Sequence, residues 1–172
     1  MKYRKRIIAC LLCLLLLSGM SGCSLPLPLI QQNSARATVD KVIDALSNND
    51  ADELLSLFSS QAISEAVDID EGVQHIMSLF EGDVETVDFG ASDNEVHRGD
   101  PGDRTTLLQT KFIVTTSTEV YLFFTVEYTE STLDPELLGL YQLQIVREED
   151  IDTEFFWGSN FGAGIYLPTN DE

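Results

Sequence analysis

Basic residues are scarce in this sequence. Ten Lys and Arg stand against 29 Asp and Glu in 172 residues, and four of the ten lie in the first six positions. A surface this acidic repels nucleic acid and anionic lipid head groups. The charge balance therefore excludes a nucleic-acid partner and favours cations, basic partners or plain solubility.

Cysteine is also rare, and its positions exclude a disulfide-stabilised domain. Cys10 and Cys13 lie inside an apolar run near the N-terminus, and Cys23 follows that run. The C-x-x-C spacing of the first pair suggests a redox or metal site, but we expect both residues to be removed with a signal peptide. The remaining chain must then be stable through its core alone.

The motifs of common catalytic sites are missing: the sequence has no nucleophile elbow, P-loop, zinc-protease helix or dinucleotide fingerprint. We expect His75 on an exposed helix face and His97 in a loop. Asp68–Gly72 does not have the spacing of a calcium loop, and the aspartates between residues 93 and 103 fit turn chemistry. We therefore expect no metal and no cofactor, and we favour a non-catalytic protein over an enzyme.

The first 22 residues have the parts of a secretory signal. Four basic residues precede the apolar run Ile7–Leu17, which is eleven residues long. At about 1.5 Å per residue the run spans about 17 Å, too short for a hydrocarbon core of roughly 30 Å. Small residues follow, as they do before a cleavage site.

The four residues Met20-Ser21-Gly22-Cys23 resemble the lipobox of bacterial lipoproteins. The resemblance implies cleavage before Cys23, diacylation of that cysteine, and a lipid anchor on the extracytoplasmic face of the cell membrane. Two acyl chains give lasting anchorage where one is marginal. An ordinary secretory signal with a chance cysteine is the alternative.

Removal of residues 1–22 leaves 150 residues, the size of one domain, with a net charge of −23. We expect residues 23–34 to be the acylated N-terminus and an extended linker, because Pro26 and Pro28 disfavour a helix. Residues 35–172 are expected to form a single α+β domain.

Apolar residues recur at helical spacing in three segments, which are Ala35–Ser47, a second helix capped by Asp50 that reaches Val67, and Ile69–Phe80. Asp50 and Asp68 each start a capping-box pattern. After Gly82 the period becomes two, and the predicted strands are 83–91, 105–116, 119–129 and 137–147. The sequence thus predicts three N-terminal helices packed on a curved antiparallel sheet of about four strands.

The strand 119–129 is apolar on both faces. We expect the helices to cover the face that holds Val120, Leu122, Phe124, Val126 and Tyr128. Tyr121 and Phe123 would then lie on an open face, and exposed aromatic surface needs a cover. The aromatic tail, residues 155–167, is the cover we favour, and a second copy of the protein is the alternative. The acidic run 148–154 is expected to be solvated or to dock a basic partner.

This order of elements resembles the nuclear-transport-factor-2-like superfamily, a cone-shaped, cystatin-like α+β fold. Within it, the chain resembles an uncharacterised family of small Gram-positive lipoproteins, domain of unknown function 5104. The resemblance covers roughly residues 35–168 and is carried by A-D-E-L-L-S-L-F-S (51–59), D-I-D-E-G-V-Q-H-I-M-S-L-F-E-G-D-V (68–84) and G-I-Y-L-P (164–168). That family has no accepted activity, so it implies no catalytic residue.

We therefore expect a non-catalytic, membrane-anchored module that binds a small ligand, a peptide or another envelope protein. The candidate ligand contacts are Tyr121, Phe123, Tyr141 and Trp157. Because some enzymes of the superfamily work with Asp and Tyr in the cone, a second hypothesis uses Asp88 and the tyrosines, if they converge. A structural homodimer is the third.

Overall fold

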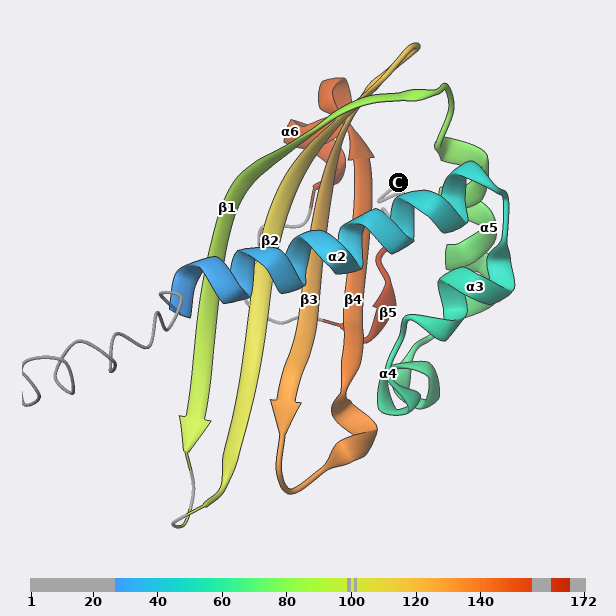
Figure 1. Ribbon diagram of the computed structural model, residues 1–172. Helices are drawn as coiled ribbons and strands as arrows, with labels where there is room; N and C mark the ends of the chain where they lie inside the picture. The colour runs from blue at the N-terminus through green and yellow to red at the C-terminus, as the bar shows by residue number, and fades with distance from the viewer. Residues whose placement is uncertain (1–26, 99, 101, 156–161, 168–172) are drawn as a thin grey trace, which may run out of the picture. The chain divides into compact units, whose positions relative to one another are not determined.

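The computed structural model describes residues 27–98, 100, 102–155 and 162–167 (Figure 1). The described part of Gln31–Glu172 forms one compact unit. The expected signal peptide, Cys23 and Trp157 lie outside the described residues. No helix in the described ranges combines the length and the apolar character that a membrane crossing requires.

Four helices precede the sheet in the described chain, where three were predicted: α2 (Leu27–Ser47), α3 (Ala51–Ser56), α4 (Ser60–Glu65) and α5 (Ile69–Leu79). The apolar stripe predicted for the first helix is buried in the core. α2 begins inside the stretch that was expected to be extended. Pro28 lies in its first turn, where a missing N–H is tolerated.

Local caps separate these helices. The Asp50 carboxylate accepts a hydrogen bond from the Glu53 N–H at 2.9 Å, as predicted. The Ser59 hydroxyl accepts one from the Ala62 N–H at 3.0 Å, and this cap starts α4 as a helix of its own. The capping box predicted at Asp68 is wrong. That residue has φ 54° and makes no side-chain cap, because a capping side chain needs extended backbone.

The sheet has five strands where about four were predicted: β1 (Val84–Arg98), β2 (Arg104–Thr116), β3 (Val120–Ser131), β4 (Gly139–Arg147) and β5 (Gly164–Ile165). Their order in the sheet is β1-β2-β3-β4-β5. The first four are antiparallel neighbours, and β5 is parallel to β4 (Figure 1). The mixed α+β class is therefore confirmed.

β1 continues to Arg98, through residues that were expected to form a polar connection. Its second half pairs residue by residue with β2, from Ser92 opposite Thr110 to Arg98 opposite Arg104. The neighbouring strand supplies the hydrogen-bond partners, so a polar segment without alternating apolar residues still becomes a strand.

The predicted face assignment of β3 is wrong. Tyr121 and Phe123 are 0% exposed and pack with the helices in the main core. Phe124 and its alternate neighbours point to the opposite face. Because both faces of this strand are apolar, alternation alone cannot tell which face the helices cover. The burial of Tyr121 and Phe123 also rules out a homodimer built on an open face at these two residues.

A second cluster, here called the outer cluster, lies on the face away from the helices and consists of Leu107, Leu122, Phe124, Val126, Val146 and Phe155. The chain reaches it through η2 (Glu148–Asp150) and α6 (Ile151–Glu154). The Phe155 ring meets Phe124 nearly edge-on, with centroids 5.8 Å apart. The start of the predicted tail therefore covers the face that the helices leave open.

Later residues of the tail return to the helix side of the sheet. Ile165 in β5 joins the main core and packs directly on α5. A Cβ placed on Gly72 of α5 would lie only 2.7 Å from the Ile165 Cβ, so the close approach of these two elements requires glycine.

Phe124→Ala is expected to lower the free energy of unfolding by about 3–5 kcal/mol, because it removes a buried aromatic ring and leaves a cavity. Urea denaturation measures the change. Leu133→Ala is the control: Leu133 is 70% exposed, and its truncation should change the free energy by less than about 0.5 kcal/mol. Equal effects of the two substitutions would show that the outer cluster does not form.

Candidate functional site

Two of the predicted ligand contacts have structural roles. The Tyr121 hydroxyl donates a hydrogen bond to the Leu79 carbonyl and accepts one from the Glu81 N–H, both at 2.9 Å. It thus ties the end of α5 to β3. Burial raises the pKa of Tyr121. With Phe123 equally buried, neither side chain is presented to a ligand.

Tyr141 lies at the surface instead. Its hydroxyl donates a hydrogen bond of 2.7 Å to the Glu65 carboxylate of α4, and its ring packs edge-on against Tyr128. Burial of the ring and the bond to Glu65 raise the pKa of Tyr141 to about 12. Hydrogen bonds from the Gln61 amide and, to a smaller extent, from the Tyr141 hydroxyl lower the pKa of Glu65.

Beside this pair lies a groove of about 390 Å³, here called the tail groove. It is lined by Glu65, Val67, Asp68, Gln142, Gly162, Ala163, Ile165, Tyr166 and Leu167. One wall is the connection between α4 and α5, and the other is the chain around β5. Tyr141, one of the predicted ligand contacts, immediately precedes Gln142, which lines the groove.

Backbone contacts hold the two walls in place. The Ser59 N–H donates to the Leu140 carbonyl at 2.8 Å, and the Leu140 N–H donates to the Leu57 carbonyl at 3.0 Å, which fixes the start of α4 at β4. On the other wall, Gly164 has φ 90°, and a Cβ there would lie 2.6 Å from the Ala66 Cβ. Only glycine lets the walls approach this closely.

Gln142 is a buried polar residue of β4. The residue lines the tail groove, is 2% exposed, and its buried Oε1 atom has no hydrogen-bond partner among the described residues. A buried amide oxygen without a partner is costly, and such groups call for an explanation. Because the Oε1 atom is itself buried, Gln142 forms part of the wall of the groove and does not present this oxygen to a ligand.

Glu127 of β3 is a polar residue that the sequence analysis missed. It faces the helix side of the sheet, where the Thr38 hydroxyl of α2 lies 3.0 Å from each carboxylate oxygen and donates to it. Burial raises the pKa of Glu127, and the Thr38 hydroxyl and the Lys41 charge partly oppose that effect. The alternation of side chains along β3 could have placed Glu127 on the helix side, because it shares a face with Tyr121 and Phe123.

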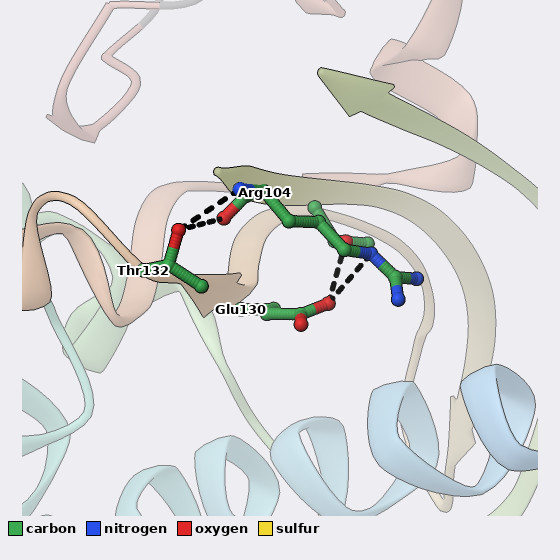
Figure 2. Close-up of polar contacts among 4 residues, drawn as sticks. Arg104, Glu130 and Thr132 are labelled. Carbon is green, nitrogen blue, oxygen red and sulfur yellow. Dashed lines mark hydrogen bonds and ion pairs between the residues drawn. The ribbon is translucent and has the colours of Figure 1, made fainter. Parts of the chain in front are cut away.

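A third polar group closes the ends of β2 and β3. The Arg104 Nε lies 2.9 Å from the Glu130 carboxylate, which also accepts a bond from the Thr106 hydroxyl at 3.2 Å. The Arg104 N–H donates to the Thr132 hydroxyl at 2.9 Å (Figure 2). About 40% of each charged side chain is exposed, so the ion pair contributes little. We assign this group a structural role.

A hollow of about 300 Å³ at the turn between β2 and β3 is lined by residues 116–120, Glu148 and Glu149. It holds part of the acidic run predicted as a solvated segment or docking patch. In the part of the chain that the structure describes, no three His, Cys, Asp or Glu side chains gather closely enough to hold a metal ion.

The groups suggested for Asp/Tyr catalysis do not converge. Asp88 is exposed on β1, and Tyr121 is buried in the main core. Tyr128 and Tyr141 pack against each other beside the outer cluster. The sequence hypothesis of one shared Asp/Tyr site is therefore not supported by the arrangement of these four residues.

A family model described as a domain of unknown function, DUF5104, matches residues 41–148. The match runs from α2 to the start of η2 and includes the α4–α5 wall of the tail groove. A search of curated proteins found no match to the chain.

Glu127→Gln is expected to raise the free energy of unfolding at neutral pH, because no charge is then buried and the amide oxygen still accepts from Thr38. The folded pKa lies above the ordinary 4.5, so the stability from the protonated carboxyl is present in acid and lost as pH rises through the folded pKa. Urea denaturation should therefore show the two proteins close together at about pH 4 and diverging towards pH 7.

The control for this experiment is Glu85→Gln on β1, where the side chain is exposed. It should show no such divergence. If the wild-type protein became more stable than the Glu127→Gln variant as pH rises, the result would contradict the burial of Glu127.

Proposed function

Since the chain belongs to the DUF5104 family, whose function is unknown, membership assigns no activity, and we propose that the protein is a membrane-anchored extracytoplasmic lipoprotein that binds a ligand or partner without catalysis. The observation that carries the binding function is the tail groove, which is lined by Glu65, Asp68 and the highly exposed Val67. The Met20–Cys23 pattern after a short apolar run supports the anchor.

The arrangement of helices over one face of an antiparallel sheet supports a nuclear-transport-factor-2-like fold as the finer classification. In that fold the concave side would be the natural site for a small ligand. Here the main core fills the helix side around Tyr121 and Phe123, which are fully buried. Binding at the edge of the sheet, where the tail groove lies, is therefore the arrangement we favour.

The directions in which the pKa values of Tyr141 and Glu65 shift do not favour acid–base catalysis by this pair near pH 7. A tyrosine with a pKa of about 12 is a poor proton donor or acceptor near pH 7. Glu65 has a lowered pKa and stays ionised. The hydrogen-bonded pair of Tyr141 and Glu65 is thus suited to keep a negative charge in a fixed place beside the groove.

Glu127 favours a second candidate function. A carboxyl whose pKa is raised by burial is a common feature of general acids and bases. An enzyme that used Glu127 would act on the helix side of the sheet and not in the tail groove. The substitution Glu127→Gln would then abolish turnover and leave the fold intact. We rank this enzyme hypothesis second because the Glu127 carboxylate has one side-chain hydrogen-bond partner, Thr38, among the described residues.

Cys23→Ser is expected to abolish membrane retention, because the acylated sulfur is lost. Immunoblots of membrane and soluble fractions measure this, and Ser24→Ala, one residue away, should leave the protein in the membrane. Continued partitioning of the Cys23→Ser protein into the membrane fraction would refute the lipid anchor.

The binding function predicts a shift in thermal unfolding when the right ligand class is added. A ligand at 100 times its Kd should add about 2.7 kcal/mol of stability. Calcium salts, envelope sugars, small apolar molecules and short peptides are the classes to screen. If no class shifts the transition, a binding site for such ligands is excluded and a protein partner becomes the leading hypothesis.

A further inference from the structure

A highly exposed apolar side chain lies at the tail groove. Val67, which lines the groove, is 82% exposed, the highest value among the exposed large apolar residues of the described chain. We call the groove with this exposed side chain the docking surface. Exposed apolar groups beside a groove are a feature of interaction sites.

Apolar and charged side chains both line the groove. Val67 and Ile165 are apolar, and Glu65 and Asp68 carry carboxylates. The occupant of the groove should therefore be amphipathic.

The charge of the docking surface has one sign. Residues 51–82, which form α3 to α5, contain seven Asp and Glu and no Lys or Arg. Glu65 and Asp68 from this segment line the groove itself. Residues 132–146 on the other side, which include Gln142, also contain no Lys or Arg. A cationic occupant would be attracted by Glu65 and Asp68, and an anionic one would be repelled.

We propose that the docking surface binds a segment of another protein in which apolar side chains are flanked by Lys or Arg. The apolar side chains enter beside Val67 and Ile165, and the flanking cations lie near Glu65 and Asp68. This inference rests on the proposed binding function and names its partner class.

Three synthetic fluorescent peptides test the chemistry. The first has the sequence Lys-Lys-Leu-Leu-Lys-Lys, the second replaces every Lys with Glu, and the third replaces both Leu with Ser. The full chain is placed in phosphatidylcholine nanodiscs, which carry no net charge, and empty nanodiscs provide the baseline. Fluorescence anisotropy should show binding of the first peptide alone, with a Kd that rises as NaCl is added.

Two charge-removing variants then test the location. Glu65→Gln with Asp68→Asn keeps both side-chain shapes, keeps an acceptor for Tyr141, and leaves a residue that tolerates left-handed backbone at position 68. It should weaken binding of the first peptide about fivefold, the effect of losing two exposed ion pairs. Glu119→Gln with Glu148→Gln removes the same charge at the other hollow and should leave the Kd unchanged.

A matched apolar pair provides a test that charge cannot mimic. Val67→Ser and Leu133→Ser both remove a highly exposed apolar side chain, so neither should disturb folding. Only Val67→Ser should weaken binding.

The results separate this inference from the proposed function. Equal losses in the two charge-removing variants would show diffuse attraction to an acidic protein and overturn the docking surface. If none of the peptides binds while a sugar or small molecule shifts thermal unfolding, the partner class is wrong and the binding function stands. If nothing binds in either experiment, both are wrong.

Discussion

The fold depends on the burial of β3 on both of its faces. On the helix side, the rings of Phe80, Tyr121 and Phe123 meet in tilted and edge-on pairs with centroids 5.2 to 6.5 Å apart, geometries that aromatic pairs prefer. On the other side, Phe124 meets Phe155. A strand buried on both faces in an antiparallel sheet needs a cover on each side, so the helices alone are not sufficient and the tail has to return across the sheet. A chain whose described residues contain no cysteine relies on these two layers for its stability.

The helices were predictable from the sequence because each carries one apolar face, and the positions of Val39 and Leu46 in the main core confirm the stripe. The orientation of β3 was not, because local alternation is symmetric between two apolar faces. The second half of β1 was missed for a related reason: its polar residues become a strand only because β2 offers them partners. At Asp68 the D-x-x-E pattern was present, but the left-handed backbone prevents the cap. Each error arises where tertiary contacts override a local pattern.

The candidate site was even less accessible to sequence reasoning. Tyr141 was named from its position on the last long strand, and it does lie beside Gln142, which lines the tail groove. Gln142 itself reads as an ordinary outward-facing polar residue until its neighbours are placed. No pattern in the sequence shows that Gly164 brings the tail against Ala66, and without that contact there is no groove. The site is thus made by a close backbone approach between two segments about 100 residues apart, which is a property of the fold.

A groove of this kind need not bind tightly if the lipid anchor holds. Exposed ion pairs such as those available to Glu65 and Asp68 contribute only about 0.2–1 kcal/mol each, and Val67 adds a small apolar contact. In solution such a site would give weak affinity. Two proteins confined to the same membrane surface meet at a much higher effective concentration, which for short tethers reaches the mM range. The modest chemistry of the docking surface and the proposed anchor at Cys23 are therefore consistent with each other: the anchor supplies the concentration, and the groove supplies the selectivity for a cationic, apolar segment.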